Sequence, residues 1–309
     1  MSDFIGGMTW GWVGTPGTWS TSEADQSLTE LAASGCTWVA LAFAAVQEPA
    51  QSTDIPFETT TVSDDELRWA IRRSHELGLQ VCVKPVVNVA DGTWRAHIGF
   101  LSPDVPGEPT WGEWFVSYER FVVHAARIAA EEGAAMLCVG CEMVRTDERE
   151  AEWRHLIAAV RDVYPGIVTY NCDKYQEDRL RWWDAVDVIS SSGYYPSGQW
   201  EQQLDRIETV IRREGKPFFF AEAGCPSRDG SPARPNDWTL AGAPSEAAQA
   251  DYYREMFAAT ERRDWVGGFL LWDWPAHLYD RSTASQNTDY CPYGKQAAEV
   301  MREYYTRRA

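Results

Sequence analysis

The chain has 309 residues, a length at which one domain of alternating strands and helices can bury a large core. Its formal net charge of −18 and its isoelectric point near 4.7 disfavour nucleic acid or an anionic membrane as a partner, because both would be repelled. No apolar stretch reaches the roughly 18 residues that a transmembrane helix needs. The opening MSDFIGGMTW has neither the basic nor the apolar region of a secretion signal.

The cysteine and tryptophan contents indicate the cellular compartment of the protein and the kind of binding site it has. Seven scattered cysteines, an odd number, fit a reducing compartment better than a disulfide framework, so we expect a cytoplasmic protein. Many of the 16 tryptophans stand beside Gly, Pro, Thr or Asp in expected loops. Any one of these rings can be core packing, but together they indicate a cleft walled with aromatic side chains.

Short apolar runs alternate with amphipathic helical windows along the chain, which is typical of a parallel sheet with crossover helices. The expected strands are Ile5–Trp10, Trp38–Phe43, Gln80–Val87, Ala135–Val139, Ile167–Tyr170, Val186–Ser191, Phe218–Ala221 and Val266–Leu271. Ser63 with Glu66, and Thr110 with Glu113, have the capping-box spacing of helix starts. Eight strand–helix pairs favour an α/β fold, a single (β/α)8 TIM barrel domain over residues 1–309, with a doubly wound sheet as the alternative.

The connections between these elements are unequal in length. Links from helix to strand are short and often contain glycine, as in ASGC and ELGL. Links from strand to helix are long, as in NVADGTWRAHIGFLSPDVPGEP and AGCPSRDGSPARPNDWTLAGAP. Long loops are commonly functional, and in a barrel these would all lie at the carboxyl ends of the strands, where barrel enzymes have their active sites.

Two apolar runs end in a glutamate. LCVGCEMV places Glu142 after the fourth expected strand, and FFFAEAG places Glu222 after the seventh. Closure of a barrel would bring both carboxyl groups to one mouth. A pair of carboxyl groups, one protonated and one ionised, suits glycoside hydrolysis. For either residue alone, an ion pair at the barrel rim is the alternative interpretation.

These residues carry a family resemblance over nearly the whole chain. The motifs MTWGW, WVALAF, VKPVVNVADGTWR, CVGCEM, DVISSSGYYP, FFFAEAGCPS and GGFLLWDWP resemble clan A glycoside hydrolases, and most of all glycoside hydrolase family 113. Described members of that family act chiefly on β-1,4-mannans and manno-oligosaccharides. The resemblance implies a retaining mechanism, with Glu142 as acid/base and Glu222 as nucleophile. Many clan members have asparagine before the acid/base, but here that residue is Cys141.

Further residues are expected to bind substrate. In SGYYP, a hydroxyl of Tyr194 or Tyr195 can hold the nucleophile ionised. Trp272, and less so Trp274, is expected as the platform under the sugar, because sugar C–H faces pack on aromatic rings. Trp10 and Trp12 alternate along the first strand, so at most one is expected to face the cavity, and Trp12 is the one we select. Lys84 and Asn88 are expected to donate to sugar hydroxyls.

Other functions stay open at this point. A desolvated Lys84 can form the Schiff base of an aldolase, the barrel can bind sugar without catalysis, and the substrate can be a β-glucan or β-glucoside. CVGC has C-x-x-C spacing but no second Cys or His pair follows it, so no metal and no cofactor are expected. The expected partner is an oligosaccharide, and the oligomeric state is not predicted.

Overall fold

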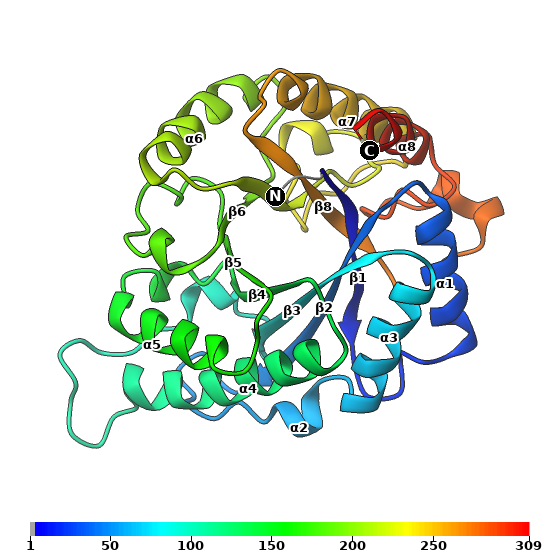
Figure 1. Cartoon of the computed structure of the whole chain (residues 1–309). Coiled ribbons are helices and arrows are strands. Elements are labelled where there is room, and N and C mark those ends of the chain that lie inside the picture. Colours follow the sequence, from blue (N-terminus) through cyan, green and yellow to red (C-terminus); the bar gives the residue numbers. More distant parts are fainter. Residues whose placement is uncertain (1–3, 309) are drawn as a thin grey trace.

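The computed structural model describes residues 4–308, so the predicted domain limits at residues 1 and 309 lie outside it. Eight parallel strands follow one another around a closed barrel, each paired with its neighbours in sequence, and β8 pairs with β1 (Figure 1). The predicted (β/α)8 barrel is therefore confirmed. The strands are β1 (Ile5–Gly14), β2 (Trp38–Gln47), β3 (Gln80–Val89), β4 (Met136–Cys141), β5 (Ile167–Cys172), β6 (Val188–Gly193), β7 (Phe218–Ala223) and β8 (Val266–Trp274).

The helices surround the barrel and cover its outer face (Figure 1). They are α1 (Ser22–Ala33), α2 (Phe57–Thr60), α3 (Asp64–Glu76), α4 (Trp111–Glu131), α5 (Glu150–Arg161), α6 (Trp200–Glu214), α7 (Glu246–Glu261) and α8 (Gln296–Arg308). Both predicted capping boxes are present, at Ser63 for α3 and at Thr110 for α4. No helix within residues 4–308 is long and apolar enough to cross a membrane.

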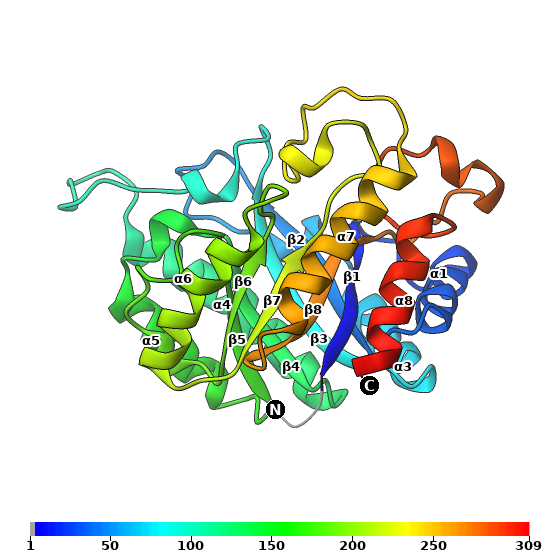
Figure 2. The same ribbon diagram turned by 90° about the horizontal axis from the view of Figure 1, so that it is seen from above.

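All eight predicted strands exist, but each extends further at its carboxyl end than predicted. The added residues include Asn88, Asn171, Ser192 and Glu222, which are polar and therefore unusual in buried strands. They are tolerated there because polar side chains of neighbouring strands bond to one another at the barrel mouth, as with Asn171 and Ser192. Figure 2 shows the long strand-to-helix connections gathered at one end of the barrel, opposite the end at which β1 begins.

The strand register shifts near the mouth. At three of these shifts, the residue pairs on either side are Met8/Leu271 and Trp10/Trp274 for β1 and β8, Ser191/Phe220 and Ser192/Glu222 for β6 and β7, and Cys138/Thr169 and Cys141/Asn171 for β4 and β5. In each case one strand has one residue more than its partner between the pairs. Such bulges re-aim side chains, so the regular alternation of inward and outward residues fails at the carboxyl ends.

Candidate active site

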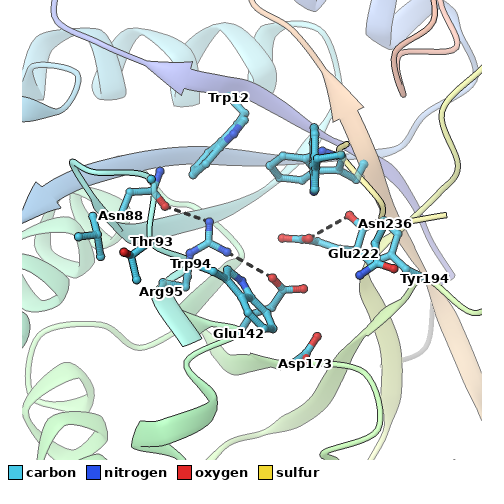
Figure 3. Close-up of a pocket in the computed structure, with 14 residues that line it drawn as sticks. Trp12, Asn88, Thr93, Trp94, Arg95, Glu142, Asp173, Tyr194, Glu222 and Asn236 are labelled. Atoms are coloured by element: carbon cyan, nitrogen blue, oxygen red, sulfur yellow. Dashed lines mark hydrogen bonds and ion pairs between the residues drawn. The ribbon is translucent and has the colours of Figure 1, made fainter. Parts of the chain in front are cut away.

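A cleft of about 590 Å³ opens at the carboxyl end of the barrel. Figure 3 shows polar side chains and aromatic rings around it. Its lining residues are Trp12, Asn88, Val89, Gly92, Thr93, Trp94, Arg95, Glu142, Asp173, Tyr194, Glu222, Asn236, Trp238 and Trp272. They come from the carboxyl ends of seven strands, all except β2, and from the long loops after β3 and β7, so barrel closure assembles the cleft from distant parts of the chain.

Glu222 lies within β7, and its carboxylate is buried and fully engaged. Lys84 Nζ donates to Oε1 at 2.5 Å, and the Cys141 thiol contacts the same oxygen at 3.2 Å. The Tyr194 hydroxyl donates to Oε2 at 3.0 Å (Figure 3). Donors of this kind favour the charged form of a carboxyl group. The arrangement therefore holds an ionised carboxylate at the floor of the cleft.

Glu142 directly follows β4 and has a left-handed backbone conformation, with φ of 53°. Such a conformation is unfavourable for a residue with a side chain, and it is often found at functional sites. Ser192 Oγ donates to Glu142 Oε1 at 2.7 Å, and Arg95 Nη1 lies 3.3 Å from Oε2 (Figure 3). One carboxylate oxygen of Glu142 lies within 4.8 Å of one of Glu222. The two predicted glutamates thus face one another across the cleft.

The two carboxyl groups have opposite electrostatic environments. For Glu222, burial raises the pKa, but the charge and hydrogen bond of Lys84, with Arg95 and Cys141, outweigh it and hold the pKa below 4.5. For Glu142, burial and then the charge of Glu222 raise the pKa above 4.5, although Arg95 and Ser192 oppose this. One group is therefore biased to stay ionised and the other to keep its proton, which is the division of labour of a nucleophile and an acid.

Four of the residues predicted to bind substrate line the cleft: Trp12, Asn88, Tyr194 and Trp272. The rings of Trp12 and Trp272 meet edge to face with centroids 5.4 Å apart. The guanidinium of Arg95 lies 5.6 Å from the Trp12 ring centre and donates to Asn88 Oδ1 at 3.1 Å. Arg95 thus connects the predicted aromatic wall to Glu142.

Three other predicted residues do not line the cleft. Tyr195 points outward and donates to Glu177 at 3.1 Å. Trp274 also points outward and donates to the carbonyl of Ser27 in α1 at 3.2 Å, because the bulge in β8 separates its face from that of Trp272. Lys84 lies beneath Glu222 and is 1% exposed, so the cleft does not reach it.

The position of Lys84 also bears on the Schiff-base alternative. Burial disfavours its charged form, but the neighbouring Cys141 and Glu222 outweigh this and raise the pKa of Lys84 above its usual value. A Schiff base requires a neutral amine, whereas this amine is protonated and ion-paired. The structure therefore argues against an aldolase and assigns Lys84 to the support of Glu222.

Several residues of the site were not predicted. Arg95 and Asp173 line the cleft, while Asn171 and Ser192 lie beneath it. The rule that identified the two glutamates, a polar residue at the carboxyl end of an apolar strand, also applies to Asn171 and Asp173 in TYNCD and to Ser192 in SSSGYY. Arg95 begins a three-residue 3-10 helix, Arg95–His97, within the long connection after β3, and no periodic pattern in the sequence places it.

One cluster has the spacing of metal ligands. Atoms of Cys141, Glu142 and Glu222 all lie within 4.8 Å of one another. However, Lys84 and Arg95 already form ion pairs with the two carboxylates. A metal cation bound here would meet two positive charges at short range, so the residues present fit a metal poorly.

The chain is similar to one known protein family and to several solved structures. The chain matches the model of Glycoside Hydrolase Family 113 over residues 8–295. It is 51% identical to a structure described as a complex of a GH113 β-1,4-mannanase, with a TM-score of 0.98, covering 99% of this chain and 100% of that one. It is 45% identical to the GH113 β-mannanase AaManA from Alicyclobacillus acidocaldarius, with a TM-score of 0.97 and coverage of 99% and 98%. No curated protein matches the chain.

Proposed function

The chain belongs to Glycoside Hydrolase Family 113, and on this basis we propose that it hydrolyses β-1,4-mannosidic bonds in manno-oligosaccharides or mannan with retention of anomeric configuration. The observation that carries the proposal is the pair Glu142 and Glu222, whose oxygens approach within 4.8 Å across the cleft. Carboxyl groups about 5–5.5 Å apart are typical of retaining enzymes, and about 6.5–9.5 Å of inverting ones. The sugar preference rests on the similar structures, which are described as β-1,4-mannanases.

In the first step, the ionised Glu222 attacks the anomeric carbon and forms a glycosyl–enzyme ester, while Glu142 protonates the departing oxygen. Ser192 donates to Glu142 Oε1, so Oε1 acts as the carbonyl-type acceptor and the proton resides on Oε2. A lone pair of Oε2 can still face Arg95 while its hydrogen points into the cleft. The neighbouring side chains thereby orient the acid.

In the second step, Glu142 acts as the base. Formation of the ester removes the charge of Glu222, which is the second-largest influence raising the pKa of Glu142 after burial. The pKa of Glu142 therefore falls in the intermediate, and the carboxylate can take a proton from the incoming water. Lys84 and Tyr194 then stabilise Glu222 as it leaves as a carboxylate.

The test is hydrolysis of β-1,4-manno-oligosaccharides followed by NMR at early times. The β-anomer of the product is expected first, since two displacements restore the configuration, and early α-anomer would contradict retention. Glu142→Gln is expected to lower kcat/KM about 10²- to 10⁴-fold, and Glu222→Gln to abolish turnover. Glu148→Gln, an exposed neighbour, serves as the control. Cleavage of cello-oligosaccharides in preference to manno-oligosaccharides would identify a β-glucan-cleaving enzyme instead.

We also propose that the enzyme acts in the cytoplasm on short imported oligosaccharides. All seven cysteines are buried and free, which suits a reducing compartment. Fractionation of the source cells, with activity assayed in each fraction, tests this, and activity confined to the medium would contradict it.

A further inference from the structure

Asp173 is a carboxyl group of the cleft that the mechanism above does not use. It directly follows β5 and is 8% exposed. Its backbone carbonyl accepts a hydrogen bond from Gln176 N at 3.2 Å. Among residues 4–308, however, no side chain donates a hydrogen bond to its carboxylate or forms an ion pair with it. It is therefore a buried polar group that has no side-chain partner yet lines the ligand cavity.

The surroundings of Asp173 are unfavourable to its charge in the free enzyme. Burial and then the charge of Glu142 raise the pKa of Asp173 to about 7, with a smaller contribution from Glu177, and Lys174 offsets this only in part. An ionised carboxylate can accept about four hydrogen bonds, and the backbone N–H of Lys174 supplies one to Asp173. Donors from a bound ligand can fill the remaining acceptor sites and so offset the cost of burying the charge.

The position of Asp173 indicates which part of the ligand supplies these donors. In Figure 3, Asp173 lies on the side of Glu142 that is remote from Glu222. Glu222 attacks the anomeric carbon from one face, and Glu142 protonates the oxygen that departs on the other. The departing group therefore lies on the Glu142 side of the reacting bond, where Asp173 is.

We propose that Asp173 accepts hydrogen bonds from hydroxyl groups of the sugar on the leaving-group side, and so selects a saccharide over a leaving group without hydroxyls. An ionised carboxylate suits this role because it only accepts, through two oxygens, and can receive two neighbouring hydroxyls at once. This inference rests on the proposed glycosidase function and assigns a specificity-determining residue to its leaving-group side.

The experiment compares two substrates with the same sugar at the reacting bond. Mannotriose has a hydroxyl-bearing leaving group, whereas phenyl β-mannoside has one that still benefits from protonation but carries no hydroxyl. Asp173→Ala is expected to lower kcat/KM for mannotriose about 10- to 100-fold, the effect of losing a hydrogen bond to a charged group. For phenyl β-mannoside the expected change is less than about 3-fold. Asp173→Asn keeps the shape and one acceptor oxygen, so an intermediate loss is expected.

The outcomes separate this inference from its alternatives. Equal losses on both substrates would mean that Asp173 acts through the proton of Glu142, and an unchanged rate on mannotriose would mean that it does not contact the sugar; either result overturns the proposal. Asp178→Asn, an exposed acid on the same loop, controls for the loss of one charge. The wild-type rates on the two substrates test the proposed function. The loss of kcat/KM on mannotriose relative to the loss on phenyl β-mannoside in Asp173→Ala tests the role of Asp173.

A binding measurement provides a second readout that does not depend on turnover. In a Glu222→Gln background, calorimetry is expected to show that Asp173→Ala weakens mannotriose binding about 10-fold or more but leaves phenyl β-mannoside binding unchanged. Equal binding of mannotriose with and without Asp173 would also overturn the proposal. Far-UV circular dichroism and thermal melting of each variant exclude misfolding as the cause.

Discussion

Asn171 donates a hydrogen bond of 3.0 Å to Ser192 and thereby connects the residues that hydrogen-bond the two glutamates. Lys84 Nζ donates both to Asn171 Oδ1, at 2.8 Å, and to Glu222. Ser192 in turn donates to Glu142. A continuous buried chain of hydrogen bonds therefore runs beneath the cleft from Glu222 to Glu142. Lys84, Asn171 and Ser192 do not line the cleft, so their removal should alter the chemistry more than ground-state binding.

Replacement of Lys84 by Met should shift the acidic limb of the pH–rate profile upward. The proposed mechanism needs ionised Glu222, and Lys84 is the main influence that lowers its pKa against the effect of burial. Without Lys84, Glu222 becomes protonated at higher pH, so kcat/KM should begin to fall at higher pH than in the wild type. The measurement is kcat/KM against pH from 3 to 7, and an unchanged acidic limb would contradict the role of Lys84.

The same variant should lose stability, because Glu222 would keep a buried charge without its partner. Breaking a buried ion pair typically costs about 3–5 kcal/mol in the free energy of unfolding. Since the folded pKa of Glu222 lies below its unfolded value of 4.5, its stabilising contribution is present above pH 4.5 and is lost as pH falls through the folded pKa. Urea unfolding at pH 7 measures the loss. The double variant Lys84→Met/Glu222→Gln, which removes both charges, should recover part of it.

Replacement of Ser192 by Ala should shift the alkaline limb of the pH–rate profile to higher pH. The hydrogen bond from Ser192 favours the charged form of Glu142 and so lowers its pKa, against the larger effects of burial and Glu222. Its removal raises this pKa, so Glu142 keeps its proton to higher pH. The maximal kcat should fall about 10-fold because the carboxyl group is no longer oriented. Ser197→Ala, an exposed serine nearby, is the control, and a downward shift would refute the assignment.

Substitutions of Trp272 should separate its ring from its indole N–H. The Nε1 atom has no hydrogen-bond partner among the described residues and is buried, so a sugar oxygen accepts from it once the side chains that cover it shift on binding. Trp272→Phe keeps an aromatic face but removes this donor, and kcat/KM for mannotriose should fall about 5- to 15-fold. For Trp272→Ala, kcat/KM for mannotriose should be about 10-fold lower still, because the apolar platform is lost as well. Trp69→Phe, on the outer helix α3, should change neither value.

Gly7 should be intolerant of any side chain. A Cβ atom there would lie 2.4 Å from the carbonyl oxygen of Trp38, a backbone atom of the neighbouring strand that cannot move without disturbing the barrel. Gly7→Ala should therefore lower the free energy of unfolding by about 2–4 kcal/mol. The matched control is Gly112→Ala near the start of α4, where the nearest atom is 4.0 Å away. Thermal or urea unfolding compares the two, and equal stability would refute the steric argument.

The sequence by itself determined the order of elements, the helix starts at Ser63 and Thr110, and the identity of the two facing glutamates. These follow from local rules, because apolar periodicity and capping chemistry depend on residues close together in the chain. The rule that strand ends carry function located Glu142 and Glu222 without any knowledge of distance. Applied equally to β5 and β6, it would also have found Asn171, Asp173 and Ser192.

Only the tertiary structure decided which face each side chain presents and which partner it has. Trp272 faces the cleft and Trp274 does not, because a bulge near the end of β8 depends on its pairing with β1, more than 250 residues away in sequence. Lys84 became the partner of Glu222, and Arg95 that of Glu142, through contacts between distant segments. A pKa, a bulge or an ion pair arises from neighbours in space, and barrel closure alone sets those neighbours.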